Sequence, residues 1–268
     1  MTRQIDSYLP YLYTSFEKGY DTIPAINFAK NNYMMPYGLV CLYMLSIFYG
    51  QKYMRYREPY QLTKYLATWN GALSIFSLMG ALRTTPELLY RLSNQPFNEL
   101  ICTDSTNTWG TGSCGLWVQL FVFSKVPELL DTFFIVARKK KLIFLHWYHH
   151  VTVLLYSWNS YAVSSPQTLP FVSINYLVHS MMYGYYGLTA IQKRPTFLKP
   201  IYITAAQIIQ MVIGTYIQIL SYYNYYNNPT CKIERKNIIA GGIMYLSYFA
   251  LFSQFAIKRY YQKRIKKL

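Results

Sequence analysis

Acidic residues are scarce in this chain, which has only 10 aspartates and glutamates among its 268 residues, against 26 lysines and arginines. Charged residues together make up 13% of the sequence, whereas hydrophobic residues make up 53%. Soluble globular domains carry about 25% charged residues, so the composition excludes an ordinary soluble protein. No segment between the apolar stretches is long enough to hold a second domain. We therefore expect one domain with several membrane spans.

Seven apolar stretches have roughly the 17 to 25 residues that an α-helix needs to cross a bilayer. The sequence thus predicts an all-α membrane protein with seven transmembrane helices, in which residues 1–33 precede a domain of residues 34–257 and a basic tail of residues 258–268 follows it. The predicted spans are residues 34–50, 65–83, 114–137, 142–161, 168–190, 200–222 and 238–257.

Basic residues gather on one side of this predicted topology, because 17 of the 26 fall in alternate loops and the tail. The positive-inside rule then makes residues 1–33 luminal and the C-terminus cytosolic. Anionic lipid headgroups attract such loops, so the net charge of +16 requires no nucleic acid as a partner.

Cysteine is rare as well, with four in the chain. Cys102 and Cys231 lie in two loops on the side predicted to be luminal. An oxidising compartment would permit a bridge between them, and two free thiols are the alternative.

The chain has only four histidines, and all of them fall inside or beside apolar stretches. His146, His149 and His150 are spaced i, i+3 and i+4, so their rings share one side of a helix. Ionisable groups are costly at membrane depth, and the cluster, together with His179, therefore indicates a functional site. Imidazoles can bind a metal or act as nucleophile and general base.

The third predicted span holds the only two carboxylates inside any predicted span, Glu128 and Asp131. Helical spacing places Lys125 and Glu128 on one face, and Pro127 is expected to kink the helix. Such a pair usually marks a site or pathway in a membrane, although mutual neutralisation is the alternative.

Polar groups also follow helical spacing in the fifth and sixth predicted spans. Asn175 precedes His179 by one turn and is expected to hold one nitrogen of its ring. A rise of 1.5 Å per residue puts Glu128, His149, His179 and Gln207 about 12 to 20 Å from the cytosolic ends of their spans. We therefore expect one buried reaction chamber that opens to the cytosol.

Membrane di-iron desaturases use a similar histidine box, but their pattern has about eight ligands in several boxes, whereas this chain has four histidines. We therefore predict that there is no metal site, and a single-metal site is the alternative.

Four motifs in order resemble the signature set of the very-long-chain fatty acid elongase (ELO) family, from about residue 34 to the C-terminus. The amino-acid sequence around the histidine box most resembles that of the family branch that acts on saturated and monounsaturated acyl-CoAs. The motifs are Lys125-x-x-Glu128-x-x-Asp131-Thr132, His146-x-x-His149-His150, His179-x-x-Met182-Tyr183-x-Tyr185-Tyr186 and Thr204-x-x-Gln207-x-x-Gln210.

The resemblance implies a very-long-chain 3-oxoacyl-CoA synthase of the endoplasmic reticulum membrane. It would condense acyl-CoA with malonyl-CoA to 3-oxoacyl-CoA, CO2 and CoA, without a cofactor. Six of the seven spans would form a barrel-like bundle around an acyl tunnel, and Cys102 would pair with Cys231. The implied partners are the ketoacyl reductase, dehydratase and enoyl reductase of the cycle, and a homodimer is compatible with the sequence.

The resemblance also gives roles to the polar residues. His149 would attack the thioester and carry the acyl group, His179 would orient the malonyl group, and Lys125 would meet a carboxylate or phosphate oxygen. The residues expected to support them are His146, His150, Glu128, Asp131 and Asn175. The residues expected to bind CoA are Arg138, Lys140, Lys199 and Arg259 at the mouth, and Tyr183, Tyr185, Thr204 and Gln207 deeper in the pocket. The end of the tail resembles a dibasic retrieval signal.

Overall fold

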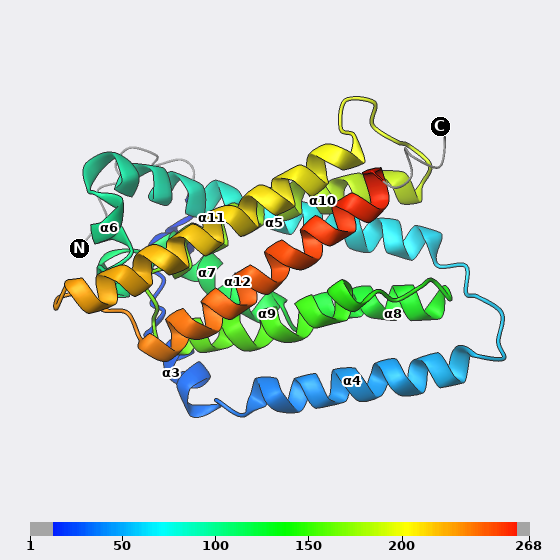
Figure 1. Ribbon diagram of the computed structural model, residues 1–268, viewed down its shortest axis with the longest axis horizontal. Coiled ribbons are helices and arrows are strands. Elements are labelled where there is room, and N and C mark those ends of the chain that lie inside the picture. The colour runs from blue at the N-terminus through cyan, green and yellow to red at the C-terminus, as the bar shows by residue number, and fades with distance from the viewer. Residues whose placement is uncertain (1–12, 262–268) are drawn as a thin grey trace.

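The computed structural model describes residues 13–261, and its regular elements in this range are helices apart from one isolated bridge between Asp21 and Thr111 (Figure 1). The predicted all-α class is therefore confirmed. Residues 1–12 of the predicted luminal segment and residues 262–268, with the predicted retrieval signal, lie outside the described range.

The long helices coincide with the predicted apolar stretches, although several extend beyond them. The long helices are α4 (Met35–Met54), α5 (Thr63–Asn94), α7 (Gly112–Ser124), α9 (Phe144–Ala162), α10 (Thr168–Ala190), α11 (Pro200–Asn227) and α12 (Arg235–Ala256). Shorter ones are α2 (Ser15–Lys18), α3 (Ile23–Asn31), α6 (Phe97–Leu100), α8 (Leu130–Ala137) and the single turns η1 (Ser105–Asn107), η2 (Pro127–Leu129) and η3 (Ile257–Tyr261).

Two helices of the described range are long and apolar enough to cross a membrane by length and composition alone. They are α11 and the continuous segment Arg235–Tyr260 that contains α12. The bent pair of α3 and α4 qualifies as a third if it is one span, with a bend of 65° between its parts. The chain is thus a membrane protein.

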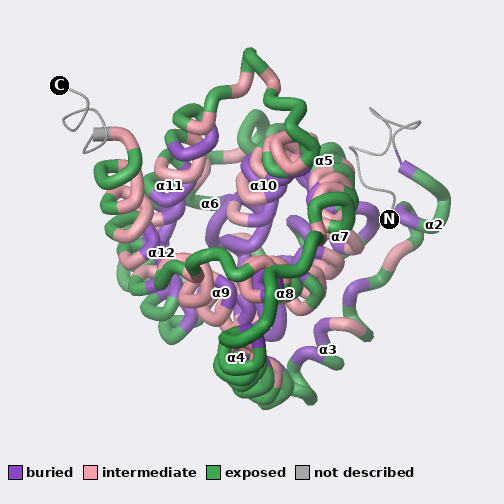
Figure 2. The backbone as a smooth tube through the Cα atoms, turned by 90° about the vertical axis from the view of Figure 1, so that its right-hand side faces the viewer, coloured by how far each residue is buried: buried purple, intermediate pink, exposed green. Residues whose placement is uncertain are grey.

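Six helices are packed in a closed cycle of neighbours. Helix α5 contacts α7, α7 contacts α9, α9 contacts α12, α12 contacts α11, α11 contacts α10, and α10 returns to α5. Figure 2 shows this arrangement end-on, with α4 outside it against α8 and α9. Glycines allow some of these close approaches, because a Cβ on Gly80 would overlap the Tyr176 ring and one on Gly214 would overlap the Tyr245 ring.

The predicted third span is not one continuous helix. Helix α7 ends at Ser124, residues Pro127–Leu129 form a 3₁₀ turn, and α8 starts at Leu130. Proline has no backbone N–H and its ring clashes with the preceding turn, so a helix breaks there. The kink predicted at Pro127 is therefore a full interruption.

The segment before α3 is fixed to the bundle by one buried carboxylate. Arg83 on α5 donates to Glu17 at 3.1 Å, and the indole of Trp117 on α7 donates to the same oxygen at 2.8 Å. The side chain of Glu17 also accepts from the backbone N–H of Thr14. Removing either charge would leave its partner buried and unpaired.

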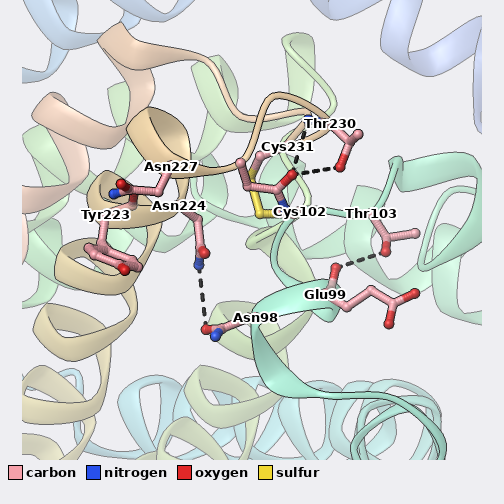
Figure 3. Close-up of a disulfide and its surroundings, with 10 residues drawn as sticks. Asn98, Glu99, Cys102, Thr103, Tyr223, Asn224, Asn227, Thr230 and Cys231 are labelled. Carbon is pink, nitrogen blue, oxygen red and sulfur yellow. Dashed lines mark hydrogen bonds between the residues drawn. A yellow bond between two sulfur atoms is a disulfide. The ribbon is translucent and has the colours of Figure 1, made fainter.

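Two loops at the end of the bundle where α11 ends are joined covalently, as the resemblance implies. Cys102 and Cys231 form a disulfide, and the backbone N–H of Lys232 donates to the carbonyl of Cys102 (Figure 3). Beside them the side chain of Asn224 donates to Asn98 at 3.4 Å. The bridge ties the end of α11 to the segment after α6.

We expect the double variant Cys102→Ser/Cys231→Ser to unfold at a lower temperature in detergent. The bridge closes a sequence separation of 129 residues, and disulfides contribute about 2–4 kcal/mol by limiting the unfolded chain. Cys41→Ser, which changes a free, exposed cysteine, is the matched control. An unchanged melting temperature of the double variant would contradict a stabilising role.

Candidate active site

A buried ion pair marks the break between α7 and α8. Lys125 Nζ donates to both carboxylate oxygens of Glu128, at 2.8 and 2.9 Å, and the side chains are only 2% and 4% exposed. Ser124 donates to the same carboxylate at 2.7 Å. The ammonium group also lies 4.0 Å from the centre of the Phe121 ring. These contacts fix the Lys125 side chain within the ring of helices.

Asp131 has partners that the sequence did not indicate. One carboxylate oxygen accepts from the indole of Trp69 at 2.6 Å, and the other accepts from the hydroxyl of Tyr183 at 2.9 Å. Asp131 was expected to hold Lys125 and the histidines, but its hydrogen bonds instead connect α8 to α5 and α10. Tyr183, expected to bind CoA, is 4% exposed and committed to this bond.

The three histidines of α9 lie together, as their spacing predicts. The ring centres of His146 and His150 are 4.6 Å apart, and those of His149 and His150 are 5.5 Å apart. His146 Nε2 is 2.9 Å from the hydroxyl of Thr132 on α8. His150 is buried, whereas His149 reaches a cavity.

Tyr248 on α12 contacts His149 in two ways. Its hydroxyl donates to the backbone carbonyl of His149 at 3.1 Å, and the two ring centres are 5.1 Å apart. The hydroxyl is also 2.6 Å from that of Thr152. Tyr248 is a site residue that the sequence analysis missed.

His179 on α10 is buried and close to the α9 cluster. Its ring meets Tyr183 edge-on at 5.3 Å, and it lies within electrostatic range of Lys125 and His149. The expected bond from Asn175 is absent, since Asn175 Oδ1 has no hydrogen-bond partner within residues 13–261. Asn175 instead lines the cavity.

The cavity starts at His149 and extends toward the end of α9, with about 50 Å³ of space for the centres of water-sized molecules. From His149 to Ser160 the helix rises about 16 Å. Its walls come from α7, α9, α10, α11 and α12. The lining residues are Phe121, Val122, His149, Val153, Tyr156, Ser157, Ser160, Thr168, Phe171, Val172, Asn175, Gln210, Met211, Met244, Tyr245 and Tyr248.

The far end of this cavity is polar. Tyr156, Ser160 and Thr168 line it, and Gln218 donates to the Tyr156 hydroxyl at 2.8 Å. Behind them Ser160 donates to Asn237 Oδ1 at 3.0 Å. Several buried atoms here lack a hydrogen-bond partner among the described residues, which is the usual setting of buried water. They are Thr168 Oγ1, Gln218 Oε1 and Asn237 Nδ2.

The residues expected to bind CoA lie partly at one end of the bundle, where α8, α10 and α12 end and α11 begins, at the right of Figure 1. Lys140, Lys199 and Arg259 are exposed there, and Arg138 is partly buried. The hydroxyl of Thr204 is 3.1 Å from that of Tyr260, and Gln207 donates to the sulfur of Met182. Tyr185 is partly buried and contacts Tyr186.

Within residues 13–261 no three side chains among histidine, cysteine, aspartate and glutamate converge in an arrangement that could hold a metal ion.

The fold and the site thus define a helical membrane protein with a buried histidine cluster at one end of a cavity. The chain matches the family described as ELO, GNS1/SUR4 family, over residues 28–268. It belongs to this family of fatty acid elongases, so the predicted resemblance is confirmed.

Several relatives bear the name "Very long chain fatty acid elongase 6". The protein of Drosophila melanogaster is 44% identical over 221 residues, which cover 82% of this chain and 70% of the fly protein. That of Gallus gallus is 40% identical and that of Homo sapiens 38%, each over 251 residues and 94% of both chains. The chain is therefore an enzyme of fatty acid elongation, and these names are consistent with the expected branch.

We expect Lys125→Met and Glu128→Gln each to lower the melting temperature in detergent more than the double variant does. Each single change leaves a polar group or a charge buried without its partner, which typically costs about 3–5 kcal/mol for a broken pair. The coupling is read from the complete double-mutant cycle. Lys30→Met, at an exposed position of α3, is the control. Additive losses would contradict a coupled pair.

Proposed function

We propose that this elongase catalyses the condensing step, in which a long-chain acyl-CoA and malonyl-CoA give 3-oxoacyl-CoA, CO2 and CoA. The observation that carries the proposal is the position of His149. It lies where a long, mostly apolar cavity meets the cluster of Lys125, His146, His150 and His179. An acyl chain in this cavity would bring its thioester to the His149 ring.

In the proposed mechanism, a ring nitrogen of His149 attacks the thioester carbon of the acyl-CoA. The carbon–sulfur bond breaks, and CoA leaves as a thiolate that takes up a proton. Malonyl-CoA then loses CO2, and the resulting enolate carbon attacks the acyl-imidazole. The carbon–nitrogen bond breaks and the imidazole is regenerated, so neither step needs an added cofactor.

The remaining groups of the site would bind the substrates and stabilise charge. Lys125, held by Glu128, would meet a carboxylate or phosphate oxygen of the substrate, and His179 would orient the malonyl group. The phosphates of CoA would meet the exposed Lys140, Lys199 and Arg259 and the partly buried Arg138.

We further propose seven transmembrane helices, six of them in a barrel around the acyl tunnel. The closed cycle of helix contacts and the cavity between these helices support this arrangement. The basic end of the bundle would face the cytosol and the disulfide end the lumen of the endoplasmic reticulum, in keeping with the positive-inside rule and with the oxidising lumen. The ketoacyl reductase, dehydratase and enoyl reductase would act on the product at the same membrane.

The central test is an assay of purified protein with palmitoyl-CoA and radiolabelled malonyl-CoA. We expect labelled 3-oxoacyl-CoA to form and to survive a chelator. His149→Ala should lower the rate by about a thousandfold or more, because the residue that carries the acyl group is lost. Tyr216→Phe, at an exposed position of α11, should retain the rate. Full activity of His149→Ala would refute the acyl-imidazole, and loss of activity with the chelator would show a need for metal.

A second prediction concerns the polar end of the cavity. The double variant Tyr156→Phe/Gln218→Leu keeps nearly the same volume but removes the hydrogen-bonded pair of Gln218 and Tyr156 at the polar end of the cavity. We expect it to accept acyl-CoAs about two carbons longer than the wild type does, since the added methylenes would then enter a less polar space. Competition between acyl-CoAs of increasing length measures the shift. If the preferred acyl-chain length stays the same, the volume of the cavity, and not its polar end, limits the length of the acyl chain.

A further inference from the structure

Helix α4 lies outside the cycle of six helices, yet one of its side chains reaches the histidine cluster. The helix is mostly exposed, and its buried residues are Pro36, Tyr43 and Met54. Pro36 and Met54 lie at its two ends, so Tyr43 is the buried residue of its middle. A hydroxyl group on an otherwise apolar, outward-facing helix needs a polar partner when it is buried.

That partner is Thr132 on α8. The hydroxyl of Tyr43 is 2.7 Å from Thr132 Oγ1, and Thr132 Oγ1 is 2.9 Å from His146 Nε2. Tyr43 is 5% exposed and Thr132 is 2% exposed, so water does not compete for these bonds. The Tyr43 ring also lies 6.3 Å from the ring of His150.

The donors and acceptors give this chain of hydroxyls a direction. Among the described residues, the Tyr43 hydroxyl has one hydrogen-bond partner, Thr132. The phenol proton can therefore form a hydrogen bond only if Tyr43 is the donor to Thr132. Thr132 has a single proton, which it can then donate to His146 Nε2. In the reverse direction the buried Tyr43 proton would have no acceptor among the described residues, and this is costly.

We propose that Tyr43 is a positioning residue of the condensing site, acting through Thr132 to hold His146 in the tautomer that is protonated on Nδ1. This inference rests on the proposed function. Because Thr132 occupies Nε2, the ring has an N–H donor, and not a lone pair, left for the histidine cluster or a substrate. The outer helix α4 thereby takes part in defining the site.

The kinetic test compares Tyr43→Phe with Tyr49→Phe, which removes an exposed hydroxyl from the same helix. We expect Tyr43→Phe to lower kcat about tenfold, the effect of one lost hydrogen bond at the reacting groups, with KM for malonyl-CoA little changed. Thr132→Val should behave alike, Thr132→Ser should restore the rate, and combining Tyr43→Phe with Thr132→Val should add no further loss. Wild-type kcat in Tyr43→Phe would overturn the proposal.

A second measurement does not depend on activity. The chain contains only four histidines, so the ring ¹⁵N signals of the labelled protein in detergent can be assigned with single His variants. We expect His146 to be protonated on Nδ1 in the wild type and to lose this preference in Tyr43→Phe but not in Tyr49→Phe. Protonation on Nε2 in the wild type would overturn the relay. If the wild type fails to condense its substrates, the proposed function falls, while the ring signals still test the relay.

Discussion

The ion pair between Lys125 and Glu128 is the contact around which the site is built. Lipid cannot solvate either charge, so the pair must be enclosed by other helices. It forms at the point where Pro127 interrupts the helix, between the end of α7 and the start of α8. On helix α8, Asp131 accepts hydrogen bonds from Trp69 and Tyr183. Thr132 of the same helix is hydrogen-bonded to His146. One break in the chain thus connects α5, α9 and α10 to a common polar centre.

The hydrogen bonds around this centre explain why the histidines can remain close together. Three neighbouring imidazole rings would repel one another if all were protonated. Hydroxyl groups suit neutral imidazoles, because a hydroxyl can donate to one nitrogen or accept from the other. Thr132 contacts His146 directly, and the Tyr248 hydroxyl contacts the backbone of His149. The hydroxyl of Thr132 is therefore suited to a neutral His146 ring.

The sequence predicted the helical class, the approximate positions of most long helices and the closeness of the three histidines on α9, because these follow from hydrophobicity and helical spacing. It predicted only a kink where the third span is interrupted between α7 and α8. The sequence analysis failed for side chains whose hydrogen-bond partners lie on other helices. The partners of Asp131 lie 62 and 52 residues away in the chain. Tyr43 is one of 30 tyrosines, and no local sequence pattern distinguishes it from the others. The predicted bond between Asn175 and His179 relied on spacing alone, and spacing does not fix which rotamer each side chain takes.

The polar end of the cavity suggests how such a site could limit chain length without a rigid wall. Two further methylenes gain about 1.6 kcal/mol when they leave water. Stripping a buried amide or hydroxyl of its water and leaving it unpaired costs about 1–3 kcal/mol for each group. Thr168, Gln218 and Asn237 each present such an atom near the end of the cavity. The cost of displacing water from two or three of these groups would therefore exceed the gain, and under the proposed function an acyl chain would stop where the apolar walls end.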